Sequence, residues 1–64
     1  MFPIFIEGKT IYFPDRDMIY PVKQTIKDCR NGLPEAEQHA RRTSKRTDDP
    51  LGLVYKQLLQ KGII

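Results

Sequence analysis

The sequence predicts a small α+β domain, in which an N-terminal β-hairpin packs on two to three α-helices in the order ββααα. Residues 2–13 are rich in Ile, Phe and Tyr around a central Gly-Lys pair, which is typical of a hairpin. Prolines stand where later segments begin, at positions suited to the first turn of a helix. Apolar residues then recur at spacings of three and four, which indicates amphipathic helices.

The length of the chain limits the size of its core. Sixty-four residues make one domain, 1–64, and a chain this short buries only about 60% of the surface that it exposes when unfolded. Cys29 is the only cysteine, so no internal disulfide can form. Stability must therefore come from one small apolar core or from a partner, and a homodimer is one way to supply it.

The predicted hairpin 2–13 has one apolar face and one mixed face. If Gly8-Lys9 is a two-residue loop with glycine first, as in a type II′ turn, Ile6 pairs with Ile11 and Phe5 with Tyr12. Side chains alternate between the two faces of a strand. One face is then apolar and belongs to the core (Ile4, Ile6, Ile11 and Phe13). The other face is mixed, and it exposes Phe5 and Tyr12 as candidate contacts for a partner.

The first predicted helix covers about residues 21–30. Pro21 fits a helix start, and Asn31-Gly32 fits a helix end. Before it, Asp17 is expected to cap a short helical turn that reaches Tyr20. Lys23, Lys27 and Arg30 follow one another at helical spacing and form a cationic stripe beside the apolar one.

Two further helices are predicted, at 34–47 and 50–61. The first has only a thin stripe of small residues to bury, and the second carries leucines at amphipathic spacing. Asp48 or Asp49 can cap the second, which begins at Pro50. The expected core contains Ile4, Ile6, Ile11, Phe13, Ile19, Val22, Ile26, Cys29, Leu33, Leu51, Val54, Leu58 and Leu59.

Residues 41–46 read RRTSKR and concentrate the positive charge of the chain. Up to Ala40 there are five Lys/Arg and six Asp/Glu, a balance of −1; from Arg41 onward there are six and two, a balance of +4. In a helix 34–47 this block follows an acidic first turn, so both ends complement the helix dipole. A local basic block is typical of a surface that binds phosphate or an acidic protein.

No catalytic or metal-binding pattern accompanies this charge. His39 lies among polar residues with no orienting partner in the sequence, and Cys29 falls on an apolar stripe. One Cys and one His cannot supply a zinc site, and the aspartates do not have the spacing of a calcium loop. We therefore expect a protein that is not an enzyme and needs no metal or cofactor.

The preferred hypothesis is binding of nucleic acid by a basic helical face. The segments 21–30 and 34–47, joined by a turn that contains glycine, have the length of a helix-turn-helix. Glu35 and Glu37 count against base reading, because they stand at the end of the second helix that usually contacts DNA. The residues assigned to this face are Lys23, Lys27, Arg30, Gln38, Arg41, Arg42, Lys45 and Arg46.

The alternative hypothesis is an accessory or inhibitor protein that binds a larger protein. It would use the basic face against an acidic protein surface, or Phe5 and Tyr12 as aromatic anchors beside a strand edge. The lone cysteine suits a reducing compartment. No stretch approaches the roughly 20 apolar residues that span a bilayer, and Pro3 interrupts the short apolar start. We therefore expect a cytoplasmic protein with no membrane partner.

Overall fold

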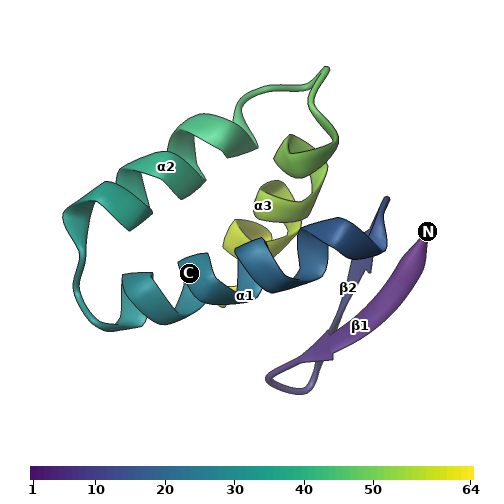
Figure 1. Cartoon of the computed structure of the whole chain (residues 1–64), viewed down its shortest axis with the longest axis horizontal. Coiled ribbons are helices and arrows are strands. Elements are labelled where there is room, and N and C mark those ends of the chain that lie inside the picture. The colour runs from purple at the N-terminus through teal and green to yellow at the C-terminus, as the bar shows by residue number, and fades with distance from the viewer.

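The computed structural model describes residues 1–64 and confirms the ββααα order (Figure 1). A two-stranded antiparallel hairpin is followed by a short 3₁₀ turn and three helices. In Figure 1 the hairpin lies at one end of the molecule, α2 lies at the other, and α3 lies between them. The elements are β1 Phe2–Ile6, β2 Lys9–Phe13, η1 Arg16–Met18, α1 Ile19–Arg30, α2 Pro34–Ser44 and α3 Pro50–Gln60.

The hairpin turn is Glu7-Gly8 rather than the predicted Gly8-Lys9. Both turn residues have positive φ, 54° and 77°, which is the backbone of a type I′ turn and matches the twist of the flanking strands. Ile6 therefore pairs with Lys9, and the predicted pairing of Ile6 with Ile11 is wrong. The sequence allowed both turns, because glycine is favoured at the first position of a II′ turn and at the second of a I′ turn.

The change of register leaves the same side chains on each face of the hairpin. The pairing is shifted by two residues, and side chains alternate between the faces with a period of two. Ile6, Ile11 and Phe13 are buried, and Ile4 is half-buried. The outer face keeps both aromatic residues exposed. They are not directly opposite each other as predicted, since Phe5 pairs with Thr10 and Tyr12 pairs with Pro3; they are diagonal neighbours.

Side chains of α3 and of the segment after it cover the outer edge of β2. The Tyr12 N–H donates to Oε1 of Gln57, and Nε2 of Gln57 donates to the Tyr12 carbonyl, each over 2.9 Å. Nζ of Lys61 donates to the Thr10 carbonyl over 2.9 Å, and Nζ of Lys9 donates to the Lys61 carbonyl. Only the β1 edge of the sheet is left without such bonds, and Pro3 removes one of its donors.

The first helix begins earlier than predicted. It starts at Ile19 instead of residue 21, so Pro21 lies within the first turn, where no N–H is required of it. The preceding turn is capped by Asp15, whose side chain accepts from the Asp17 N–H over 3.0 Å. The predicted capping role of Asp17 is therefore wrong.

α2 ends at Ser44, three residues before the predicted end. The chain then turns through Lys45 and Arg46, whose N–H groups donate to Arg42 and Thr43. This turn lies against Gly52 in the first turn of α3, so closely that a Cβ on Gly52 would stand 2.1 Å from the Arg46 carbonyl oxygen. α3 itself is capped as predicted, because Asp49 accepts from the Leu51 N–H over 2.9 Å.

The core lies between the apolar hairpin face and the three helices. Its buried apolar residues are Ile6, Ile11, Phe13, Val22, Ile26, Ala40, Val54, Tyr55, Leu58 and Ile63. Leu33 was predicted in the core but is 42% exposed in the α1–α2 connection, and Cys29 and Leu59 are only half-buried. Tyr55, Ala40 and Ile63 complete the core instead. No helix has the length and apolar character needed to cross a bilayer.

Candidate functional site

The C-terminal half of α2 and the turn that follows it present the basic block to solvent. Ala40 and Thr43 are the buried residues of this helix, so the positions between and after them point away from the core. All four cations of the block are exposed, namely Arg41, Arg42, Lys45 and Arg46. They lie at the negative end of the helix dipole, which stabilises positive charge there.

The four cations have no acidic partner within the protein. The structure has one ion pair, and it joins Arg30 to Glu7 in the hairpin turn. The guanidinium of Arg30 also donates to the Ile63 carbonyl over 3.2 Å. The hydrogen bond to Glu7 raises the pKa of Arg30 above its ordinary value. Arg30 is thus engaged inside the molecule, whereas none of the four cations of the block is in an ion pair.

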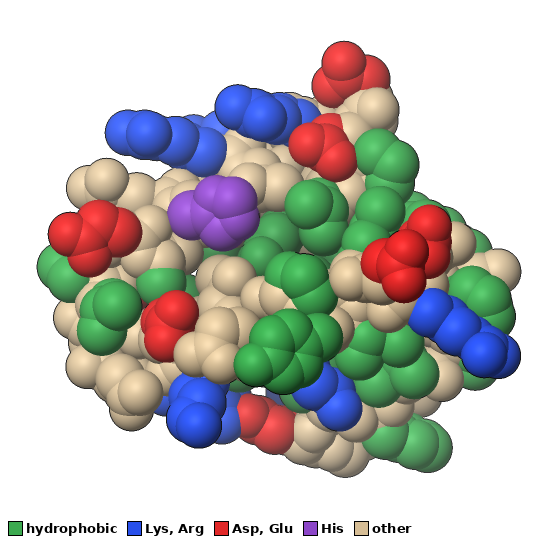
Figure 2. Space-filling model, in the orientation of Figure 1, with side chains coloured by type: hydrophobic (Ala, Val, Ile, Leu, Met, Phe, Trp, Pro, Cys, Tyr) green, Lys and Arg blue, Asp and Glu red, His purple; other side chains and the backbone are tan.

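The predicted basic face is divided between two helices. Lys23 and Lys27 are exposed on α1, and Gln38 is exposed on α2. In Figure 2 the Lys and Arg side chains gather over the C-terminal half of α2, and others lie along the opposite edge of the view, near α1. The single histidine lies on the face between them. We therefore treat the end of α2 as the main candidate site and the α1 lysines as a separate group.

His39 is exposed on α2, and its ring packs edge-on against the buried ring of Tyr55, with centroids 5.6 Å apart and an interplanar angle of 81°. The Tyr55 hydroxyl donates to Oγ1 of Thr25 over 3.0 Å. His39 itself forms no hydrogen bond or ion pair, so no polar partner orients its imidazole ring. The contact connects α2 and α3 by packing, and it gives His39 a structural neighbour.

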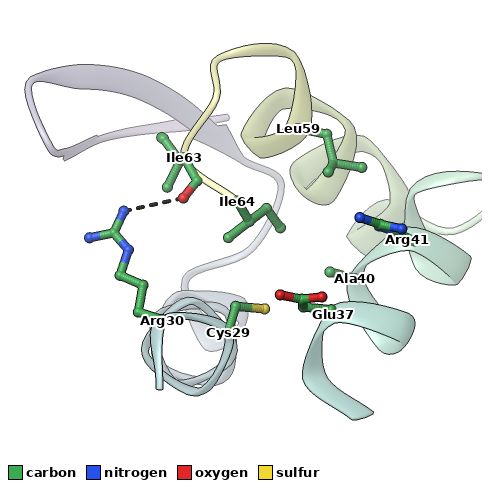
Figure 3. A pocket seen from close by; sticks show the side chains of 8 residues that line it. All are labelled: Cys29, Arg30, Glu37, Ala40, Arg41, Leu59, Ile63 and Ile64. Atoms are coloured by element: carbon green, nitrogen blue, oxygen red, sulfur yellow. Dashed lines mark hydrogen bonds between the residues drawn. The ribbon is translucent and has the colours of Figure 1, made fainter. Parts of the chain in front are cut away.

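A hollow of about 220 Å³ opens between α1, α2 and the last two residues, and we call it the α1–α2 hollow (Figure 3). The sulfur of Cys29 and the carboxylate of Glu37 point into it, and Arg41 lies at the far side. Burial raises the pKa of the Cys29 thiol, and the charges of Glu37 and Asp28 raise it further. This thiol is therefore less nucleophilic than a free cysteine.

A second hollow, of about 170 Å³, lies between the α2–α3 connection and α3, and we call it the α2–α3 hollow. It is lined by Ser44, Arg46, Thr47, Gly52, Leu53 and Lys56. No carboxylate lines it. Lys56 is not among the site residues predicted from the sequence, because it lies on a different helix from the basic block. The signal available was weak: Gly52 and Lys56 are four residues apart and share a face of α3.

Comparisons with protein family models, with curated proteins and with solved structures find no match to this chain.

Proposed function

We propose that this chain is a small non-enzymatic binding protein that holds nucleic acid through the C-terminal end of α2. One observation carries the proposal: Arg41, Arg42, Lys45 and Arg46 are all exposed within a short stretch, and none of them is in an ion pair. Such a cluster attracts phosphates and displaces their counterions, which is the main source of affinity in binding that does not depend on sequence. The cytoplasmic location expected from the lone cysteine belongs to the same proposal.

The distribution of charge along α2, acidic at its start and basic at its end, favours contact with the phosphate backbone over the reading of bases. A recognition helix usually places its N-terminal residues against base edges. In α2 that end carries Glu35 and Glu37, both exposed, and their charge repels phosphate. The last part of the block stands clear of these carboxylates, because Lys45 lies about 12 Å along the helix axis from Glu37 at 1.5 Å per residue, whereas Arg41 is only about 6 Å along the axis from it.

The proposal predicts that replacing Arg41 and Arg42 with alanine weakens binding to all sequences alike. Each lost phosphate contact should lower the slope of log affinity against log salt by about 0.9 on duplex DNA. Fluorescence anisotropy of labelled duplexes and single strands, measured over a range of salt concentrations, gives both quantities. The matched control is the pair Lys23→Ala and Lys27→Ala, which removes the same charge from α1.

Two results would contradict this proposal. One is the absence of salt-dependent binding by the unmodified protein to any duplex or single strand. The other is an equal loss of affinity in the α1 control and the α2 variant, which would mean that total charge matters and the position of the cluster does not. Circular dichroism of each variant checks that the fold is retained.

A second candidate function is binding of a protein partner through the outer face of the hairpin. The exposed aromatic residues favour it: Phe5 is 76% exposed and Tyr12 is 48% exposed, on one face and in adjacent strands. Aromatic side chains dominate the binding energy of many protein interfaces. The free edge of β1 lies beside them and can accept an added strand, although Pro3 limits the number of donors.

For this second function, Phe5→Ala or Tyr12→Ala should reduce partner capture more than Arg41→Ala does. Truncating a residue at an interface hot spot typically costs about 2 kcal/mol or more, roughly a thirtyfold loss of affinity. Capture from native lysate after nuclease treatment, followed by affinity measurement on the purified partner, provides the comparison. Capture that disappears with nuclease, or that ignores both aromatic substitutions, would exclude the hairpin face.

A further inference from the structure

The α2–α3 hollow has the chemistry of an anion site. Two cationic residues line it from different elements: Arg46 from the α2–α3 connection and Lys56 from α3. Both are exposed, and neither is in an ion pair. Thr47 adds a hydroxyl that makes no hydrogen bond within the protein, so its proton is available to an acceptor. The Ser44 hydroxyl is occupied, since it donates to the Arg41 carbonyl over 2.7 Å.

The backbone that frames the hollow is held in place by its own contacts. The Arg46 N–H donates to Thr43 and the Asp49 N–H donates to the Arg46 carbonyl, so successive turns are bonded together. Gly52 packs its Cα directly against this segment. The Cα atoms of Arg46 and Lys56 therefore keep a fixed separation, and only their side chains must adjust to a ligand. Such preorganisation lowers the entropic cost of binding.

The size of the hollow selects a small ligand group. At about 170 Å³ it is below the range of about 300–1,000 Å³ that is typical of pockets for drug-sized molecules. An arginine fork and a lysine ammonium together suit the oxygens of a phosphate group. Leu53, which is 43% exposed, provides an apolar wall beside these cations, and it can contact the sugar that carries the phosphate.

We infer that the α2–α3 hollow binds one phosphate group, held between Arg46 and Lys56 with Thr47 as an additional donor. The inference rests on the proposed function for the source of that phosphate, which would be the backbone of the bound strand. It extends the site from α2 onto α3 and assigns a role to Lys56, a residue outside the basic block.

Two aspartates lie next to the hollow in sequence, and they define a control. Asp49 is half-buried, and its carboxylate accepts from the Leu51 N–H, so part of its charge is used within the helix cap. Asp48 is exposed and forms no ion pair. Its negative charge opposes an incoming phosphate. Asp48→Asn should therefore strengthen phosphate binding, which is the reverse of the effect expected for the loss of either cation.

The test uses the whole chain, labelled with ¹⁵N and titrated with inorganic phosphate at constant ionic strength against chloride. Amide shifts should concentrate in two segments, residues 44–47 and 52–56. They should disappear in the pair Arg46→Gln and Lys56→Gln and persist in the control pair Lys23→Gln and Lys27→Gln. Shifts spread evenly over all cationic surfaces, or unchanged in the Arg46 and Lys56 pair, would overturn the inference.

A second measurement separates failure of this inference from failure of the proposed function. Lys56→Gln alone should lower the salt slope of oligonucleotide binding by about 0.7 on single strands and about 0.9 on duplexes. If the oligonucleotide binds but Lys56→Gln leaves the slope unchanged, the inference is wrong and the proposed function stands. If no oligonucleotide binds while inorganic phosphate still shifts the two segments, the proposed function is wrong and the hollow remains a phosphate site.

Discussion

Replacing Gly52 with alanine is expected to destabilise the protein by about 2–4 kcal/mol, which is enough to unfold a large fraction of a domain of this size. The added Cβ would stand 2.1 Å from the Arg46 carbonyl oxygen and 2.8 Å from that of Thr43. Both obstacles are backbone atoms, so no side chain can rotate out of the way. Alanine elsewhere in a helix interior is better than glycine by about 1 kcal/mol, and here the clash reverses that preference.

Urea denaturation followed by circular dichroism measures this effect. The matched control is Gly62→Ala, where a Cβ would meet no atom within 4 Å but φ is +72°. That change should cost only the strain of a left-handed backbone, about 1–2 kcal/mol. A Gly52→Ala protein as stable as the original would show that α3 does not approach the α2–α3 turn this closely.

Replacing Tyr55 with alanine is expected to cost about 3–5 kcal/mol, the range seen when a large aromatic side chain is removed from a core. Tyr55 is 1% exposed. It lies on α3 and contacts the two other helices, because its hydroxyl donates to Thr25 on α1 and its ring packs against His39 on α2. The alanine variant should therefore lose its cooperative unfolding transition or show it at much lower denaturant concentration.

The conservative variant Tyr55→Phe separates the ring from the hydroxyl. It keeps the packing and loses one hydrogen bond, so its cost should be about 1 kcal/mol. A Tyr55→Phe protein as unstable as Tyr55→Ala would contradict the view that the ring supplies most of the stabilisation.

The original protein and the Tyr55→Phe variant should also differ in how their free energy of unfolding changes at alkaline pH. Burial raises the pKa of Tyr55, while the hydrogen bond with Thr25 acts in the opposite direction and is the smaller influence. In the unfolded chain a tyrosine titrates near pH 10. Below about pH 10 Tyr55 makes its full contribution to the stability of the folded protein. That contribution is lost as the pH rises from about 10 through the higher pKa of Tyr55 in the folded state. Tyr55→Phe should lack this part of the decline.

The two faces of the hairpin could be predicted from alternation alone, because Ile6, Ile11 and Phe13 share one face in either register. The register itself could not. Gly8 fits the first position of one turn type and the second position of the other. The type I′ turn was selected even though Glu7 must adopt positive φ, and Glu7 gains the ion pair with Arg30 there. That contact lies 23 residues away in sequence and leaves no local signal.

The starts of α2 and α3 and the end of α1 were predicted correctly, whereas the start of α1 and the end of α2 were not. Pro34 and Pro50 begin α2 and α3 as expected, because proline at the first helical position is a local preference. The end of α2 at Ser44 depends on the approach of Gly52, and a glycine in the first turn of a helix gives no sign of what packs against it. Leu33 was placed in the core from its apolar character, but the tight connection between α1 and α2 leaves it exposed.

For the candidate site, the charged block could be predicted because charge density is a property of the sequence itself. Exposure of Arg41, Arg42, Lys45 and Arg46 follows from the small residues that α2 buries. The engagement of Arg30 by Glu7 and Ile63 could not be predicted, and neither could the position of Lys56 beside Arg46. Each of these depends on elements that meet only in the folded protein.

The bonds from Gln57 and Lys61 to the hairpin have a consequence for the order in which the chain folds. The two bonds between Tyr12 and Gln57 join positions that are 45 residues apart. Closing so long a loop costs entropy before any bond is gained, and an isolated two-stranded hairpin is marginally stable in water. The three helices meet through shorter loops, so we expect the strands to become fixed late, once α3 has docked.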